Sequence, residues 1–229
     1  MQPEIRMTSS TQVLAPETHK VLRNTYMLLG ITLIPTVIGA FIGLNSNFAF
    51  LAQYPIMGPL LMFAAMMGLL FGVSATRNSV WGLVLLLAFT FVAGWWLGPM
   101  LQAALNLSNG AQLIGMAAGG TAVIFFSLAG FATITRKDFS FMGKFLFIGL
   151  ILLIVASIAN LFFQVPAASL AISAIAILLF SGYILYDVSR IVNGGETNYV
   201  MATMALYLDI YNIFVNLLHL LMAFSGQRD

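Results

Sequence analysis

Residues 144–163 read KFLFIGLILLIVASIANLFF, and the only charged residue among them is Lys144 at the start. A helix of about 20 predominantly apolar residues is long enough to span the hydrocarbon core of a bilayer. The rest of the chain has the same character, because 61% of its 229 residues are hydrophobic and 7% are charged, whereas ordinary soluble domains are roughly 25% charged. The sequence therefore predicts an integral membrane protein.

Long uncharged runs indicate how many times the chain crosses the membrane. Runs of 53, 58 and 42 uncharged residues lie between Arg23 and Arg77, between Arg77 and Arg136, and between Lys144 and Asp187. Each holds about two spans of roughly 20 residues, and none alternates polar and apolar residues as a membrane β-strand does. We predict an all-α membrane protein with seven transmembrane helices, at about 24–44, 56–75, 80–99, 111–134, 144–163, 168–191 and 200–223.

The basic residues predict the orientation of this zigzag of helices. One side carries Arg6, Lys20, Arg23, Arg77, Arg136, Lys137, Lys144 and Arg190, and the other side carries only Arg228. Since basic residues favour the cytoplasmic side, we expect a cytoplasmic N-terminus and an external C-terminus. We expect residues 1–20 to form a disordered cytoplasmic tail because they are polar and contain two prolines. Residues 21–225 then form the membrane domain, and residues 226–229 form a short external end.

Several predicted spans contain glycines four residues apart. These pairs are Gly39 and Gly43, Gly68 and Gly72, Gly94 and Gly98, and Gly115 and Gly119. In a membrane this spacing lets two helix backbones approach closely, so we expect the glycines to be packing contacts. Pro35 and Pro99 lie in the first span and at the end of the third, where they are expected to kink the helices.

Asp187 and Asp209 stand out inside the sixth and seventh predicted spans. An ionisable side chain in a spanning helix costs roughly 2.5 to 3.5 kcal/mol on insertion scales, so it is rarely kept unless it pairs, binds an ion or moves a proton. Both aspartates lie below the membrane surface on the predicted cytoplasmic side, where contact between them is feasible. Asp187 also has a local candidate partner, because Arg190 follows it at a spacing that allows a salt bridge on one helix.

Two carboxyl groups brought together out of water cannot both ionise cheaply, so they share one proton. When that proton is lost they repel each other and become a candidate ligand for a hard cation such as Ca²⁺, which prefers carboxylate oxygens. We therefore predict that Asp187 and Asp209 form a pH-sensing, ion-gating pair, with Ca²⁺ as a candidate bound or permeant ion.

The seventh span also carries a polar face. Asp209 is followed by Asn212, Asn216 and His219 at offsets of 3, 7 and 10 residues, which places all four within an arc of about 80°. Polar groups that face lipid would lack hydrogen-bond partners, so we expect this helix in the centre of the bundle. The face is either a polar path for ions or a set of hydrogen bonds to neighbouring helices.

Six motifs distributed along the chain resemble those of one known family. They are THKVLRNTY at 18–26, GWWLGP at 94–99, TRKDFSF at 135–141, YDVSRIV at 186–192, GGETNY at 194–199 and ALYLDIYNIF at 205–214. Together they are similar to the Bax inhibitor-1 family, and in particular to its bacterial, YccA-like branch, which is associated with modulation of the FtsH membrane protease. The resemblance covers nearly the whole chain.

This resemblance implies a multi-pass protein of the bacterial inner membrane, with the seventh helix central and a pH-sensitive Ca²⁺ leak in members that carry the aspartate pair. Asp187 and Asp209 occupy the matching positions, and Arg77 and Arg190 are candidate latch partners of the pair. Some channel-type members have an acidic residue in the second helix, which residues 56–75 lack. The implied partner is an FtsH-type protease, and the alternative function is that of a non-channel regulator of that protease.

Other functional classes fit the sequence less well. The chain has no cysteine, which excludes disulfides, thiolate metal sites and cysteine nucleophiles. Tyr186 and Asp187 fit the pattern of an intramembrane aspartyl protease, but Asp209 does not follow the Gly-x-Gly sequence of that class. Ser74 and His219 fall near opposite membrane faces, too far apart for a serine protease, and the last span has no lysine to carry retinal. We expect no enzyme activity, no cofactor and no nucleic-acid partner.

Overall fold

The computed structural model of the chain describes residues 14–49, 53–54 and 56–225. Its helices are α1 (Leu14–Leu44), α3 (Met57–Thr76), α4 (Val80–Trp96), α5 (Gly98–Leu105), α6 (Gly110–Thr135), η1 (Ser140–Met142), α7 (Gly143–Phe163), α8 (Pro166–Val192) and α9 (Tyr199–Ser225). Within these described residues, seven segments are long and apolar enough to cross a membrane, with α4 and α5 counted as one and η1 and α7 as one. The predicted all-α fold with seven spans is therefore confirmed.

The structure extends two of the predicted spans. Helix α1 begins at Leu14 rather than near residue 24, so residues 14–20, which were expected in the disordered tail, are helical. Hydropathy marks the part of a helix that lies in lipid, and a helix can continue into water beyond it. The third span bends at Leu97 and continues as α5 to Leu105, with Pro99 in the first turn of α5, where proline is tolerated. The remainder of the tail predicted at 1–20, which is residues 1–13, and the external end predicted at 226–229 lie outside the described residues.

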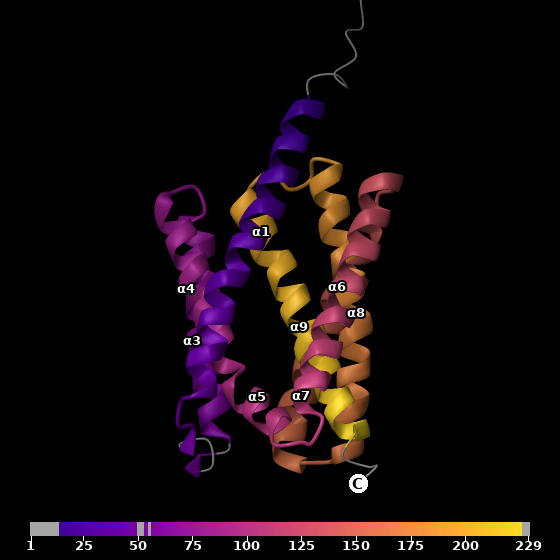
Figure 1. The fold of residues 1–229 in the computed structure, drawn as a ribbon. Coiled ribbons are helices and arrows are strands. Elements are labelled where there is room, and N and C mark those ends of the chain that lie inside the picture. The colour runs from indigo at the N-terminus through magenta and orange to yellow at the C-terminus, as the bar shows by residue number, and fades with distance from the viewer. Residues whose placement is uncertain (1–13, 50–52, 55, 226–229) are drawn as a thin grey trace, which may run out of the picture.

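Helix α9 occupies the middle of the bundle, as predicted. It packs against α8, α6 and α1, and more weakly against α4. In Figure 1, α1, α3 and α4 form one half of the molecule, α6, α7 and α8 form the other, and α9 runs between them. Helix α3 packs mainly on α4 and α7 mainly on α8, so these two helices are peripheral.

Glycines allow α1 and α4 to pack with their backbones in contact. A Cβ atom added at Gly39 would overlap the carbonyl oxygen of Phe91, and one added at Gly94 would overlap the carbonyl oxygen of Thr36. Gly98, the first residue of α5, also lies close to the backbone of α1, where an added Cβ would be 2.6 Å from the carbonyl oxygen of Gly43. The close packing predicted from the glycine spacing is therefore confirmed for this helix pair, which forms the most extensive interface in the molecule.

Other glycines of the same spacing do not make such contacts. Among the residues that the structure describes, no atom of a neighbouring element lies within 4 Å of a Cβ added at Gly68, Gly115 or Gly119. The expectation of close helix packing is wrong for these three positions. Spacing alone predicts that a small-residue face exists, and it does not predict whether another helix of the same chain covers it.

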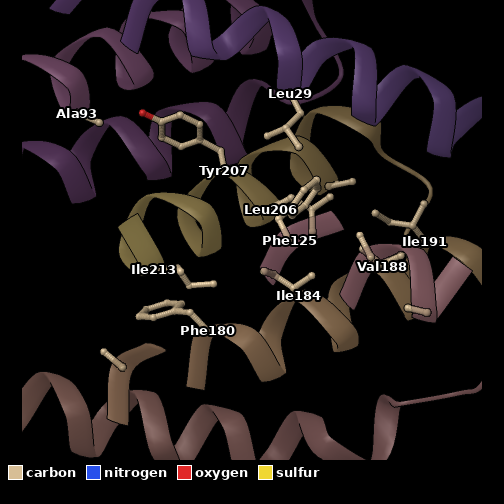
Figure 2. Packing of buried hydrophobic residues seen from close by; sticks show 14 of the residues in the cluster. Leu29, Ala93, Phe125, Phe180, Ile184, Val188, Ile191, Leu206, Tyr207 and Ile213 are labelled. Atoms are coloured by element: carbon tan, nitrogen blue, oxygen red, sulfur yellow. The ribbon is translucent and has the colours of Figure 1, made fainter. Parts of the chain in front are cut away.

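The hydrophobic core surrounds α9 at mid-height. Figure 2 shows Leu206, Tyr207 and Ile213 of α9 among Leu29 of α1 and Phe125 of α6, with residues of α4 and α8 completing the cluster. The three α9 residues are at most 2% exposed. Because large buried side chains converge on it from four other helices, α9 is fixed in position relative to all of them.

Loops at one end of the bundle are tied together by hydrogen bonds. Asn198 Nδ2 donates to the carbonyl oxygen of Arg77 (3.2 Å), and Ser189 Oγ donates to the carbonyl oxygen of Lys137 (3.0 Å). We call this the basic end, and its basic residues are Lys20, Arg23, Arg77, Arg136, Lys137, Lys144 and Arg190. Helix α1 starts at this end, and α9 runs from it to the opposite end (Figure 1). Arg6 and Arg228 lie outside the described residues.

We expect the basic end to face the cytoplasm. A reporter enzyme that is active only outside the cytoplasm should be active when fused after the last residue and silent when fused after Lys137, because basic residues are retained on the cytoplasmic side. Colony assays with the two fusions, normalised to the amount of each fusion protein, measure this. The reverse pattern, or equal activity in both fusions, would contradict the predicted orientation.

Candidate functional site

The two aspartates inside the spans meet at the contact between α8 and α9. Asp209 is 3% exposed, and its Oδ2 atom is buried without a hydrogen-bond partner among the described residues. Asp187 is half-buried, and the two carboxyl groups lie close enough for a direct side-chain interaction. The structure therefore brings together the pair on which the sequence-based hypothesis depends.

Apolar stripes on both helices turn these carboxyl groups toward each other. On α9, Leu206 and Ile213 are fully buried and flank Asp209 at three and four residues, so all three share one helix face. On α8, Ile184 and Val188 are fully buried, and Asp187 lies beside that stripe. Burial of the apolar residues thus fixes the rotation of each helix, and the carboxyl groups are carried into the interior with them.

Arg190, predicted as a local partner of Asp187, forms its ion pair elsewhere. Its Nη2 atom lies 3.6 Å from Glu196 Oε2 and 3.3 Å from the carbonyl oxygen of Gly195, and its guanidinium lies over the ring of Tyr186. The positive φ of 76° at Gly194 ends α8 and turns the chain back so that Glu196 approaches the helix end. Arg190 still acts electrostatically on the Asp187 carboxyl group.

Glu196 is the residue of this site that the sequence reasoning missed. It lies in the loop between α8 and α9, and its charge acts on Asp187 as well as on Arg190. The signal was present in the sequence, because Gly194 and Gly195 directly precede it and a glycine after a helix end commonly reverses the chain. A charged residue just beyond such a reversal is placed to meet the last turn of the helix.

Arg77, the second candidate latch partner, does not contact the carboxyl pair. Its side chain is exposed at the turn between α3 and α4, and the single ion pair among the described residues is that of Arg190 with Glu196. The backbone of Arg77 is connected to the site, because its carbonyl oxygen accepts a hydrogen bond from Asn198. Asn198 also caps α9, since its Oδ1 accepts the N–H groups of Val200 and Met201.

The remaining polar residues of α9 are satisfied mostly within the helix. Asn212 donates to the carbonyl oxygen of Leu208 and Asn216 to that of Asn212, each at 2.8 Å. His219 Nδ1 is 2.9 Å from Ser173 Oγ on α8. Of the three residues, His219 therefore makes the hydrogen bond between helices that one interpretation of the polar face predicted.

Two tyrosines provide cross-helix hydrogen bonds that were not predicted. The Tyr207 hydroxyl lies 2.8 Å from Thr36 Oγ1 on α1 and 3.3 Å from the carbonyl oxygen of Thr90 on α4. The Tyr211 hydroxyl donates to the carbonyl oxygen of Ala93 on α4 (3.1 Å). Figure 2 shows the Tyr207 hydroxyl pointing toward the helix that carries Ala93. The face of α9 opposite the carboxyl pair is thus hydrogen-bonded to the other half of the bundle.

The carboxyl pair is small for a resident metal site. No group of three or more His, Cys, Asp or Glu side chains converges within the part of the chain that the structure describes. Ca²⁺ takes six to eight oxygen ligands, so most of its ligands here would be water and backbone oxygens. Two carboxylates with several waters fit a cation in passage better than one held tightly.

A third aspartate, Asp138, differs from the pair in its surroundings. It lies in the exposed loop between α6 and α7. Hydrogen bonds from the hydroxyl and the backbone N–H of Ser140 hold the pKa of Asp138 below its usual value. Asp138 is therefore ionised at neutral pH and outside the bundle, which makes it a useful comparison for the buried carboxyl groups.

Comparisons with known proteins cover almost the whole chain. The model of a family described as "Inhibitor of apoptosis-promoting Bax1" matches residues 18–226. The chain is 44% identical over 204 residues to a protein of Escherichia coli strain K12 named "Modulator of FtsH protease YccA". The matched region covers 89% of this chain and 90% of that protein. It is 43% identical over 205 residues to an uncharacterized membrane protein of Vibrio cholerae, with 90% of both chains covered. The family match includes both helices of the carboxyl pair.

Proposed function

The chain belongs to the Bax inhibitor-1 family, as the resemblance of its motifs predicted, and we propose that it is a pH-sensitive cation leak of the bacterial inner membrane. In this proposal Asp187 and Asp209 form the gate, and Ca²⁺ is the permeant ion. The observation that carries the proposal is the direct interaction of two carboxyl groups between α8 and α9 toward the basic end, one of them with a buried oxygen that has no partner among the described residues.

The gate works through the cost of placing two negative charges together out of water. While the pair shares one proton, a hydrogen bond between the carboxyl groups holds α8 and α9 together. Loss of that proton leaves two like charges in contact, which disfavours the closed contact and attracts a cation. The pair is thus both the latch and the site at which a hard cation is first dehydrated.

The polar residues beyond the gate provide a path in the same proposal. Asn212 and Asn216 continue the face of α9 that carries Asp209, and His219 with Ser173 lies further along toward the opposite end. At the basic end, Glu196 offsets Arg190 and so reduces the positive charge that a cation meets near Asp187. Without this ion pair, the net positive charge at the basic end would repel cations more strongly.

Flux measurements test the proposal directly. Vesicles reconstituted with the purified protein and loaded with a Ca²⁺-sensitive dye should take up Ca²⁺ faster than protein-free vesicles, and the rate should change several-fold between about pH 6 and 8, the range in which a buried carboxyl group commonly titrates. Flux no greater than that of protein-free vesicles at every pH would contradict the leak.

A second candidate function is regulation of a membrane protease. The specific observation that favours it is the 44% identity to the Escherichia coli protein named as a modulator of FtsH. In this function the membrane domain docks on an FtsH-type protease, and the residues that precede α1 are presented to it and strengthen the binding. The two functions are separable, because the carboxyl pair lies inside the bundle and the N-terminal residues precede it.

We expect the full-length protein to copurify with an FtsH-type protease, and deletion of residues 2–13 to reduce that copurification several-fold with Ca²⁺ flux unchanged. The deletion ends before α1 begins, so the helical bundle is intact. Immunoblots of the protease after detergent extraction, with and without crosslinker, measure the association. Full-length Asp209→Asn, which alters the gate alone, is the matched control and should copurify normally. Absence of the protease under both conditions would argue strongly against this function.

A further inference from the structure

A lateral groove separates the two halves of the bundle. It lies between α1 and α6 with α9 as its floor, and it has a volume of about 870 Å³, within the range of about 300 to 1,000 Å³ typical of ligand sites. Helix α1 makes its contacts with α4, α9, α5 and α8, whereas α6 packs on α9, α8 and α5. In Figure 1, α9 lies between α1 and α6, on the far side of the space between them.

The walls of the groove are almost wholly apolar. They include Leu33 and Val37 of α1, Phe126 and Ile134 of α6, and Ile210 and Phe214 of α9, and no charged residue is among them. Val37 is 67% exposed and Phe126 is 71% exposed, so the rim opens sideways toward the surrounding membrane. The chemistry of the walls fits hydrocarbon.

The tyrosine hydroxyl groups in the floor of the groove are already hydrogen-bonded to the protein. Tyr207 and Tyr211 contribute to its floor, but their hydroxyl groups are hydrogen-bonded to Thr36, Thr90 and Ala93. The floor therefore presents aromatic rings rather than hydrogen-bond donors. A ligand that needed several hydrogen bonds inside the groove would be poorly matched to it.

Glycines keep part of the groove wide. Gly30 of α1 and Gly130 of α6 both line it, and a Cβ atom added at either one would meet no atom within 4 Å. Larger side chains at these positions would therefore occupy the groove without pushing the backbone aside.

Positive charge lies where the groove reaches the basic end. The groove extends to Tyr26 on α1 and Ile134 on α6. Arg23 precedes Tyr26 by three residues, which places it on the same helix face one turn nearer the end, and Arg136 follows α6 directly. Both arginines are exposed, and neither forms an ion pair with a carboxylate of the described residues.

We propose that this groove binds an anionic phospholipid from the surrounding membrane. Its acyl chains lie along the apolar walls, and its phosphate lies at the basic end near Arg23 and Arg136. Arginine is suited to phosphate because its planar guanidinium donates two parallel hydrogen bonds. The bound lipid fills the space between α1 and α6 and so links the two halves of the bundle. The inference does not depend on the carboxyl pair or on a protease partner.

A transmembrane helix of another protein is the competing occupant, and the observations favour the lipid. The walls are uncharged and have few free hydrogen-bonding groups. Arg23 and Arg136, at the basic end of the groove, favour the binding of an anionic group at the membrane surface. A lipid supplies both features in one molecule and is present around every membrane protein. The experiments below separate the two occupants.

Lipid binding can be measured on the full-length protein in detergent. Phosphatidylglycerol and phosphatidylcholine with identical acyl chains are added in turn, and native mass spectrometry reports the bound fraction while a thermal melt reports stabilisation. We expect one tightly bound phosphatidylglycerol and at least several-fold weaker binding of phosphatidylcholine. Gly130→Leu should weaken binding of both lipids about tenfold or more by filling the groove. Gly119→Leu, on the same helix and equally open but outside the groove, is the matched control and should bind normally.

The charge at the basic end is tested separately. Arg23→Gln with Arg136→Asn should remove the preference for phosphatidylglycerol, and Lys144→Gln, an exposed basic residue on α7, should leave it intact. Asn suits position 136 because φ there is 51° and asparagine tolerates this conformation. Gly30→Leu repeats the groove-filling test from α1, so the proposal stays testable if one variant does not fold.

Three results would overturn the proposal. They are equal affinity for the two lipids, undiminished binding by both groove-filling variants, and photo-crosslinks from Val37 in native membranes that join a protein rather than a lipid. The last result would assign the groove to a partner helix.

Discussion

Replacing Asp209 with asparagine should abolish the pH response of cation flux, so that the rates measured at about pH 6 and pH 8 become nearly equal. The amide keeps a hydrogen-bonding group opposite Asp187 but cannot lose a proton, and the second negative charge never appears. In the wild-type protein, by contrast, raising the pH removes the shared proton, the carboxylates repel, and flux rises. The measurement is Ca²⁺ uptake by reconstituted vesicles at matched protein content.

Two further variants make this test specific. Asp138→Asn removes a carboxyl group at the same end of the molecule but in an exposed loop, and it should leave the pH profile unchanged. Asp187→Asn combined with Asp209→Asn should resemble one of the single variants, because residues in direct contact are not independent. If Asp187→Asn and Asp209→Asn were both normally folded and both kept the wild-type pH profile, the two aspartates would have only a packing role.

Replacing Gly94 with valine should prevent α1 from packing on α4 and should sharply lower the yield and melting temperature of the protein. A Cβ atom at this position overlaps the backbone of α1 at Thr36, and backbone cannot move aside as a flexible side chain can. Overpacking in a well-packed core costs typically 1–3 kcal/mol and occasionally more, and this site belongs at the upper end. Thermal unfolding of the protein in detergent, followed by circular dichroism, measures the effect.

The matched control for Gly94 is Gly119→Val, which makes the same chemical change at a position with open space beside it. It should melt within a few degrees of the wild type. If Gly94→Val were as stable as Gly119→Val, the close contact between α1 and α4 would not be the feature that stabilises this half of the bundle.

The spans were predictable because burial in lipid imposes long apolar runs. Hydropathy located all seven to within a few residues at most ends. It failed at the start of α1, where residues 14–20 continue the helix outside any apolar run. It also failed beyond Pro99, where a proline in the first turn of α5 permits the helix to resume.

The pairing of Asp187 with Asp209 was predictable from depth, whereas the partners around them were not. Spacing suggested that Arg190 would bind Asp187, but the turn at Gly194 brings Glu196 to Arg190, and these two residues form the ion pair. Sequence spacing predicts which residues are neighbours on one helix. It does not predict whether a residue of the following loop, such as Glu196, folds back to make a closer contact. Asn212 shows the same limit, because helical periodicity predicts its direction but not that its amide bonds to its own helix.

The order in which the chain is made bears on how its centre is completed. Helices α3 and α7 pack on the helix that follows each of them, so each can dock as a local hairpin soon after insertion. Among the described helices α9 is the last to be synthesised, yet it contacts α1, the first of them. Domains generally assemble from the N-terminus as synthesis proceeds, and α1 can pack on α4 early, but it must wait in the bilayer for its contact with α9. A nascent chain that stops before Tyr199 would leave the inner faces of α1, α6 and α8 toward lipid, and the bundle closes only after α9 has been inserted.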